Sequence, residues 1–335
     1  MVNRDINFSL WLDFIEHDYL KNEFGKLLDE GVVNGATSNP AIFANAITTS
    51  PAYQEQLKAL QGRSPKEKYE ALAIEDIRTA AKMLRPLYNA NNDGFISIEV
   101  DPFLCHDTEG TVAEGRRLFQ AIGEPNVMIK VPATQAGYKA MTQLMKDGIS
   151  VNATLVFSPK QARACFKAMT KGIAKCEADG GCRVEGVISI FVSRFDRALD
   201  QELESVGVDP AKTGIYNAAK IYNMIESYEI PNIRALFAST GVKGEGLPAN
   251  YYIRELMAEH SINTAPLATI QAHLQATKNQ KAPTVLPLEE SLLNGYFTQL
   301  EDNGFKMSEI YQTLLDEGLR AFEQSFADML KQLEE

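Results

Sequence analysis

The chain of 335 residues is 45% hydrophobic and 23% charged, a composition that excludes disordered and fibrous proteins and is sufficient for a large core. Its net charge of −11 argues against a broad binding surface for nucleic acid or for an anionic membrane. The N-terminus lacks a signal-peptide pattern, and no apolar run reaches the length of about 18 residues that spans a membrane. We therefore expect a cytoplasmic protein without nucleic-acid or membrane partners.

Metal and nucleotide sites are not indicated by the sequence. The four cysteines show no CxxC spacing and no zinc-like pairing with the four histidines, so we expect reduced, mostly buried thiols. No GxGxxG or GxxxxGKS/T element stands at a strand-to-helix junction, and HExxH does not occur. We expect neither a metal nor a cofactor.

Short apolar runs alternate with segments of helical periodicity, which is typical of βα units and a parallel sheet. In chain order, the candidate strands are SLWLDF, GVVNGATSNP, FISIEV, VMIKV, SVNATLVF, GVISIFV, RALFAS and SINTAPLA. The second and the last are weaker candidates, because they are short and interrupted by Gly, Asn or Pro. Counting both gives eight strands, the number of a closed (β/α)8 TIM barrel.

The segments between these runs carry apolar residues at three- and four-residue spacing, which predicts helices. The predicted helices cover residues 16–29, 65–88, 111–122, 136–146, 159–177, 209–227 and 268–276. The long gap between the second and third strands must hold extra helices. Residues 288–333 predict two or three more helices, with a break near Asn303 and Gly304. We expect one domain over 1–335, with additional N-proximal helices and a C-terminal helical extension over about 285–335.

The run NVMIKVPAT, residues 126–134, places a lysine at the end of an apolar strand. Successive residues of a barrel strand point alternately to the helices and to the interior, so Met128 and Lys130 face inward and the branched residues of the run face the helices. Because Pro132 donates no ladder hydrogen bond, Lys130 is predicted to lie at the C-terminal end of its strand.

The same alternation brings polar side chains from four other strands to this end of the barrel. Their inward sets are Trp11 and Asp13, Ser97 and Glu99, Asn152 and Thr154, and Val187, Ser189 and Phe191. The outward set beside Thr154 is Val151, Ala153 and Leu155. The C-terminal mouth of a barrel is where enzymes of this architecture build their sites.

Each of these polar residues taken alone is more often a satisfied buried group than a functional one. Burying a lysine and two carboxylates together has little structural benefit, because a well-packed apolar replacement is often neutral or more stable by about 1–4 kcal/mol. The cluster as a whole therefore favours a catalytic site.

A lysine in an apolar wall is suited to carbonyl chemistry. Desolvation disfavours its ammonium form, and the free amine attacks a carbonyl to form a Schiff base, an electron sink for making or breaking a carbon–carbon bond. Glu99 or Asp13 would move protons, and Asn and Ser side chains would hold hydroxyls.

Seven motifs in register resemble the transaldolase family. They are WLD at 11–13, GATSNPAIF at 35–43, IEVDP at 98–102, IKVPAT at 129–134, GISVNATLVFSPKQA at 148–162, ISIFVSR at 188–194 and ASTGVK at 238–243. Their order and spacing agree over nearly the whole chain, most closely with the bacterial branch that reads TSNP(T/A)IF and ASTG. The resemblance implies an (α/β)8 barrel.

The resemblance also implies a cofactor-free reaction of the non-oxidative pentose phosphate pathway, in which sedoheptulose 7-phosphate and glyceraldehyde 3-phosphate give erythrose 4-phosphate and fructose 6-phosphate. A dihydroxyacetone unit passes between the sugar phosphates on a lysine Schiff base, and Lys130 matches that lysine. Glu99 and Thr154 match the pair that holds a catalytic water. Asp13 matches the group that takes the C4 hydroxyl proton as the C3–C4 bond breaks.

Substrate contacts are implied in the same way. Asn39 and Asn152 match the residues that bind the dihydroxyacetone hydroxyls, and Ser189 matches a further substrate contact. Arg194 matches a cation for the substrate phosphate.

One departure concerns that phosphate. The second phosphate arginine of other branches, which follows the serine of the seventh strand, is absent after Ser239. Lys243, helped by Ser239 and backbone N–H groups, is one candidate to supply the charge. A loop lysine is most often simply solvated, so both interpretations stay open.

Two other functions fit parts of the sequence. A class I aldolase on the same barrel would release free dihydroxyacetone, but aldolases of the superfamily tend to carry tyrosine where Phe191 stands, and a phenyl ring cannot position the water that protonates the enamine. A barrel that binds sugar phosphates without chemistry has no need of a desolvated Lys130. The sequence leaves open whether the chain is a monomer or a homodimer.

Overall fold

The computed structural model describes residues 4–38, 40–181, 183–243, 246–277 and 283–334. Parallel strands form a closed barrel in which each strand pairs with the next and β8 pairs with β1. The strands are β1 (Ser9–Leu12), β2 (Gly35–Thr37), β3 (Ile96–Glu99), β4 (Val127–Pro132), β5 (Val151–Val156), β6 (Gly186–Phe191), β7 (Ile233–Ala238) and β8 (Ser261–Ala265). The predicted (β/α)8 barrel is confirmed, the two weaker strand candidates included.

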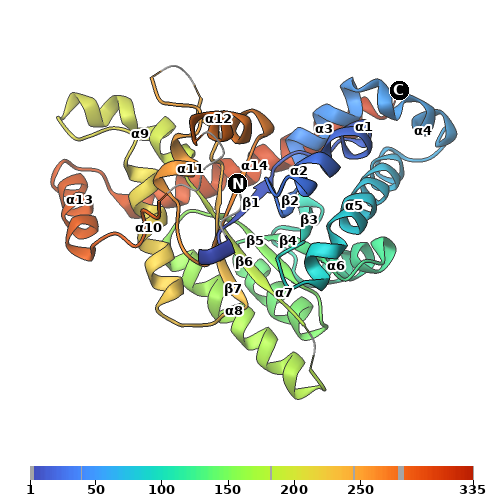
Figure 1. The fold of residues 1–335 in the computed structure, drawn as a ribbon, viewed down its shortest axis with the longest axis horizontal. Helices are drawn as coiled ribbons and strands as arrows, with labels where there is room; N and C mark the ends of the chain where they lie inside the picture. Colours follow the sequence, from blue (N-terminus) through green and yellow to red (C-terminus); the bar gives the residue numbers. More distant parts are fainter. Residues whose placement is uncertain (1–3, 39, 182, 244–245, 278–282, 335) are drawn as a thin grey trace.

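Helices surround the barrel (Figure 1). Those that match predicted helices are α5 (Pro65–Asn89), α6 (Thr108–Ile122), α7 (Gln135–Lys146), α8 (Pro159–Ala178), α10 (Thr213–Glu226), α12 (Leu267–Thr277), α13 (Glu290–Asp302) and α14 (Met307–Gln332). The gap between β2 and β3 also holds α3 (Pro40–Thr49) and α4 (Gln54–Ala59), so the prediction of extra helices there is confirmed. Short 3₁₀ turns are η1 (Arg4–Ile6), η3 (Pro51–Tyr53) and η4 (Pro102–Leu104).

The helix pattern departs from the prediction in two ways. The helix expected over 16–29 is interrupted, because a π-helical turn, η2 (Leu20–Phe24), separates α1 (His17–Tyr19) from α2 (Gly25–Asp29). The predicted helices do not include α9 (Ser193–Ser205) or α11 (Tyr251–Glu255). Buried apolar residues at four-residue spacing do indicate a helix at α9. The segment follows β6 without a loop, which hides the start of this helix in the sequence.

The predicted alternation of inward and outward side chains holds in β1, β3, β4 and β6 but fails in β5. Its register with β6 shifts between Ala153 and Val156, and Leu155 has a φ of 56°, in the left-handed region. A bulge of this kind inserts extra residues and re-aims the side chains that follow. Leu155 therefore leaves the outer set of Val151 and Ala153: it belongs to a different apolar cluster and lies close to Gly318 of α14, so the alternation predicted for it fails.

The C-terminal helix α14 lies across one side of the barrel and packs against α3, α5, η4 and β5 (Figure 1). The break near Gly304 separates it from α13, as expected, and Gly304 has a φ of 88°. Contacts of α14 with early and central elements support one domain over 1–335, which stays a prediction.

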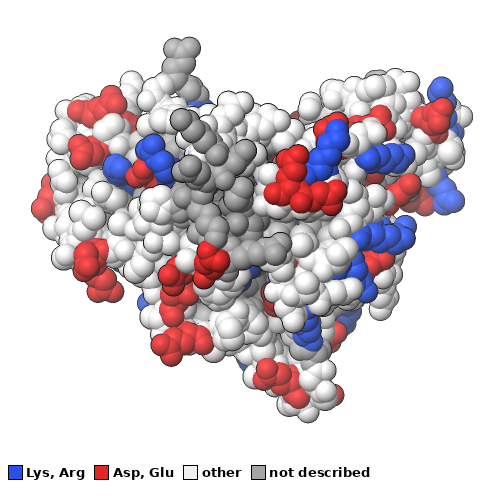
Figure 2. Space-filling view, in the orientation of Figure 1, with Lys and Arg blue, Asp and Glu red and all other residues white. Residues whose placement is uncertain are grey.

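The surface and the cysteines bear on the remaining expectations. Basic and acidic side chains are intermixed on the face shown in Figure 2. Over the described ranges, no helix has both the length and the apolar character needed to cross a membrane. Cys105 and Cys165 are free and buried, as expected, but Cys176 is disulfide-bonded, so the expectation of reduced thiols is wrong there. The spacing of the cysteines gave no sign of that bond.

A buried hydrogen-bond network holds the segment that follows β1. Asp76 of α5 is fully buried, its Oδ2 accepts a hydrogen bond from the Tyr53 hydroxyl at 2.7 Å, and its Oδ1 lies 2.8 Å from Nδ1 of His17. Tyr53→Phe is expected to lower the free energy of unfolding by about 1.5–3 kcal/mol, because a buried carboxylate loses a donor. Urea denaturation measures this, with the exposed Tyr228→Phe as control; equal effects of the two substitutions would contradict it.

Candidate active site

Three neighbouring strands bring the central polar groups side by side. Glu99 of β3 pairs in register with Lys130 of β4, which pairs in register with Asn152 of β5. All three point to the barrel interior and are buried, at 6%, 5% and 0% exposure. The inward orientation predicted for them from strand alternation is confirmed.

Lys130 is held by few contacts. Its Nζ donates a hydrogen bond to the backbone carbonyl of Ser38 at 3.1 Å and lies 3.9 Å from Oε2 of Glu99. The amine thus lies near one carbonyl and one more distant carboxylate, and the other residues of its strand are apolar. An amine so loosely held remains available to a carbonyl substrate.

Glu99 and Thr154 are the least satisfied polar groups of the site. Neither carboxylate oxygen of Glu99, nor the Thr154 hydroxyl, has a hydrogen-bond partner among the residues that the structure describes. Burial raises the pKa of Glu99 to about 7; the nearby Lys130 opposes this rise and Asp13 adds to it. A carboxyl with this pKa is suited both to donate and to accept a proton near neutral pH.

Asp13 follows β1 and reaches the same mouth from the opposite side. Its Oδ1 accepts a hydrogen bond of 2.7 Å from Thr37, whose Oγ1 also lies 2.7 Å from Oγ1 of Thr264 on β8. Burial raises the pKa of Asp13, while Lys130 and the Thr37 hydrogen bond oppose the rise. Two carboxyl groups therefore flank one lysine.

Asn152 and Ser189 form a short chain of hydrogen bonds beneath the cavity. Ser189 donates to Oδ1 of Asn152 at 2.7 Å, and Nδ2 of Asn152 donates to Oγ of Ser97 at 3.2 Å. The chain fixes which atoms of the amide face the mouth. Asn39, the other amide implied by the resemblance, lies outside the described residues.

An open cavity at the C-terminal mouth joins Asp13, Lys130 and Ser189 to a cluster of cations, whereas Glu99, Asn152 and Thr154 lie outside its lining. Its lining includes Asp13, Lys130, Ser189, Phe191, Arg194, Arg197, Ser239 and Lys243. Within the described part of the chain, no hydrogen bond or ion pair is formed by the side chains of Arg194, Arg197 and Lys243. Desolvation and the neighbouring Arg197 lower the pKa of Arg194. Arg194 is half-buried and Arg197 is exposed, and two neighbouring guanidinium groups without a partner in the described ranges are suited to bind an anion.

Arg197 is the residue that sequence reasoning missed. It lies on α9, three residues after Arg194, so the two side chains share one face of the helix. Recognising α9 by its apolar spacing would have revealed this. The expected position of Lys243 at the cavity is met, and so is that of Ser239, whose Oγ lies 3.0 Å from Oγ of Ser193.

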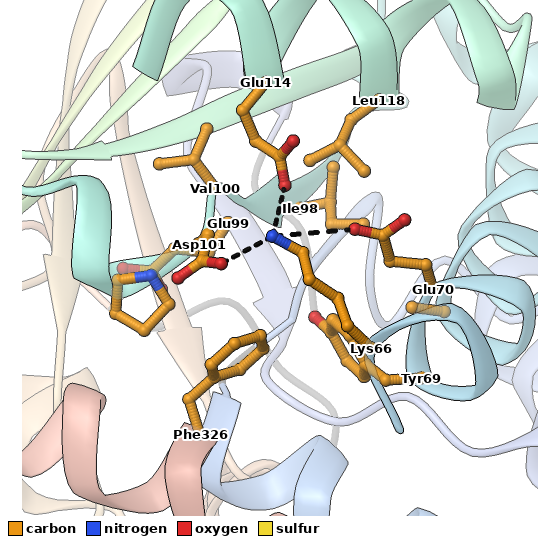
Figure 3. A pocket seen from close by; sticks show the side chains of 12 residues that line it. Lys66, Tyr69, Glu70, Ile98, Glu99, Val100, Asp101, Glu114, Leu118 and Phe326 are labelled. Atoms are coloured by element: carbon orange, nitrogen blue, oxygen red, sulfur yellow. Dashed lines mark hydrogen bonds and ion pairs between the residues drawn. The ribbon is translucent and has the colours of Figure 1, made fainter. Parts of the chain in front are cut away.

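The segment that follows Glu99 is fixed from outside the barrel. Figure 3 shows the Lys66 amine of α5 between three carboxylates, those of Asp101 (2.6 Å), Glu114 (3.6 Å) and Glu70 (4.0 Å). Asp101 begins the loop after β3, and Phe326 of α14 lines the same small pocket. These ion pairs are half exposed and individually weak, but together they hold the loop against α5 and α6.

No group of three metal-ligating side chains gathers anywhere in the described ranges. What the site offers is a buried amine, two carboxyl groups of raised pKa and a rim of cationic side chains.

Comparisons with known proteins agree with this arrangement. The family model described as Transaldolase/Fructose-6-phosphate aldolase matches residues 10–333. A protein of Campylobacter jejuni subsp. jejuni (strain 81-176), named Transaldolase, is 48% identical over 334 residues, covering 98% of this chain and 99% of its own. A protein of Helicobacter pylori (strain P12) with the same name is 43% identical over 325 residues, covering 97% of this chain and 98% of its own.

Proposed function

The chain belongs to the transaldolase/fructose-6-phosphate aldolase family, and from that premise we propose that it transfers a dihydroxyacetone unit between sugar phosphates on Lys130. The donor is a ketose phosphate and the acceptor an aldose phosphate. The observation that carries the proposal is the buried amine of Lys130 beside two carboxyl groups, in a cavity rimmed by cations that have no partner among the described residues.

The first stage forms the Schiff base. The Lys130 amine attacks the C2 carbonyl of the ketose, and the resulting carbinolamine loses its hydroxyl as water to give an iminium ion. Protons for these steps move through a water held by Glu99 and Thr154. The pKa of Glu99, about 7, and the unpaired oxygens of both residues support this role.

The second stage breaks the carbon–carbon bond. Asp13 takes the proton of the C4 hydroxyl, the C3–C4 bond cleaves, and its electron pair moves to the iminium nitrogen, leaving an enamine on Lys130 and a free aldose phosphate. The enamine then attacks the aldehyde of the acceptor, and Asp13 returns its proton to the new hydroxyl. Asn152, with Asn39, would hold the hydroxyls of the dihydroxyacetone unit, and Ser189 adds a further substrate contact.

The phosphate would bind at Arg194, with Arg197 and Lys243 supplying the charge that the missing second arginine provides elsewhere. Arg197→Met is expected to raise the KM for fructose 6-phosphate about tenfold, with a smaller change in kcat, because a charge-assisted contact is lost. Steady-state kinetics measures this. The exposed Arg63→Met, on the loop before α5, serves as control, and an unchanged KM in Arg197→Met would return that arginine to a solvated surface role.

The main alternative is an aldolase that releases free dihydroxyacetone. Phe191 supports transfer, because its ring packs 5.3 Å from that of Phe157 and offers no hydroxyl to hold a protonating water. Turnover of fructose 6-phosphate is therefore expected to depend on erythrose 4-phosphate, as measured by release of glyceraldehyde 3-phosphate. Turnover that is indifferent to the acceptor would favour the aldolase.

We further propose that the enzyme acts in the cytoplasm as a single-domain monomer or homodimer. Sugar phosphates as substrates support the compartment. Light scattering of the purified chain distinguishes the two oligomeric states, and a larger assembly would contradict both.

A further inference from the structure

Gly318 stands at the centre of the contact between α14 and the mouth of the barrel. A Cβ atom placed on it would lie 2.9 Å from Cδ2 of Leu155 and 3.4 Å from Nη1 of Arg194. The residue is buried in the middle of a 26-residue helix, where glycine costs about 1 kcal/mol relative to alanine. Glycine at this position therefore indicates that Leu155 and Arg194 must approach the backbone of the helix closely.

Arg194 is held between two surfaces. Its guanidinium carbon lies 5.4 Å from the centre of the Phe191 ring, and Nη1 faces the backbone of Gly318. Glu317, the neighbour of Gly318, contributes a negative charge nearby and forms no ion pair with any residue that the structure describes. A long side chain confined in this way loses little further freedom when it binds a ligand.

The other atom near Gly318 belongs to the bulge of β5. Leu155 follows Thr154, and its φ of 56° turns its side chain toward α14. A side chain at this position would therefore meet both the phosphate-binding arginine and the residue after the water-holding threonine.

The helix has limited room to move away from these contacts. Phe326, two turns further along α14, packs edge-on against Tyr69 at 5.3 Å and against Phe103 at 6.1 Å. Near its end, Lys68 donates to the carbonyl of Leu333 at 2.6 Å. A methyl group added at Gly318 would therefore clash with Cδ2 of Leu155, which would have to shift, and would come into contact with Nη1 of Arg194 at 3.4 Å.

We propose that Gly318 is a positioning residue: the missing side chain lets α14 hold Arg194 against Phe191 in the orientation that receives the substrate phosphate. This inference rests on the proposed role of Arg194 as the phosphate cation. It assigns to the C-terminal extension a specific part in recognising phosphorylated substrates.

The test compares a phosphorylated donor with its unphosphorylated counterpart. Single-turnover cleavage of fructose 6-phosphate and of fructose by excess enzyme, without acceptor, isolates the donor half-reaction. The variants are Gly318→Ala, Arg194→Met, the double variant, and Gly295→Ala as control. Gly295 lies inside α13 with no atom within 4 Å of an added Cβ, so it reports the helix-propensity effect alone. Gly318→Ala is also made with Leu155→Ala, which removes the closest atom, leaves room for the added methyl group and avoids a β-branched residue at the positive φ of Leu155.

Gly318→Ala is expected to raise two quantities about tenfold: the fructose 6-phosphate concentration that gives half the maximal cleavage rate, and the inhibition constant of inorganic phosphate. Cleavage of fructose should be unchanged. In the Arg194→Met background it should have no further effect, because both act through one contact. Gly295→Ala should change neither donor.

Three results would overturn the inference. An equal loss with fructose would make Gly318 an ordinary packing residue. Independent, multiplicative losses in the double variant would show that it does not act through Arg194. The third is an unchanged preference for the phosphorylated donor. If Arg194→Met leaves this preference unchanged, both the phosphate role of Arg194 and this inference fail. If only Gly318→Ala leaves it unchanged, this inference fails and the phosphate role of Arg194 stands.

Discussion

Lys130→Met is expected to reduce transfer activity by about 10⁴-fold or more, because it removes the buried amine that forms the covalent intermediate. The fold should persist, since an unbranched apolar side chain suits the wall made by β3, β4 and β5. Coupled assay of erythrose 4-phosphate-dependent turnover measures the loss. Lys139→Met, at an exposed position of α7, is the control and should be fully active.

The stability of Lys130→Met is expected to depend on pH, because the charge of Glu99 depends on pH. Removing one member of a buried ion pair is costly when the other stays charged. At pH 6 Glu99, with its pKa of about 7, is mostly protonated, so Lys130→Met should match the parent protein in thermal unfolding. A large loss of stability at pH 6 would return Lys130 to a structural role.

Glu99→Gln is expected to lower activity by about 10²–10⁴-fold, since the proton-transfer partner of the water is lost. An inflection of the pH–rate profile near the Glu99 pKa of about 7 should disappear with it. The exposed Glu177→Gln is the control. Retention of that inflection in Glu99→Gln would assign the titration to another group.

The same variant should be more stable than the parent protein at alkaline pH. The folded-state pKa of Glu99 is raised from 4.5 to about 7, so burial of the ionised carboxyl has no cost below about pH 4.5, and a cost that grows until the pH passes 7. Above pH 7 the difference in free energy of unfolding should reach about 1–3 kcal/mol in favour of Glu99→Gln. Denaturant unfolding at pH 5 and pH 8 measures it, and a gap that is equal at both values would contradict the argument.

Strand alternation predicted the central site because β3 and β4 are regular. Glu99, Lys130 and Asn152 lie in register, and each occupies the position that a two-residue period assigns to it. The period failed in β5 after Thr154, where the bulge at Leu155 re-aims the side chain. A bulge depends on tertiary contacts, in this case with α14, which a local pattern does not contain.

The phosphate end of the site was less accessible to sequence reasoning. Arg194 was found through a motif, whereas Arg197 required the recognition that β6 passes directly into α9. Gly318 has no local signature at all, because its significance is the approach of two segments that lie far apart in the chain. Local pattern thus identifies the reacting groups more readily than the residues that orient them.

Borohydride trapping tests the central claim most directly. The protein is incubated with fructose 6-phosphate, reduced with borohydride and digested, and the modified peptide is located by mass spectrometry. We expect a single dihydroxyacetone-derived adduct on Lys130, absent from Lys130→Met. Failure to trap an adduct, or an adduct on a different lysine, would contradict it.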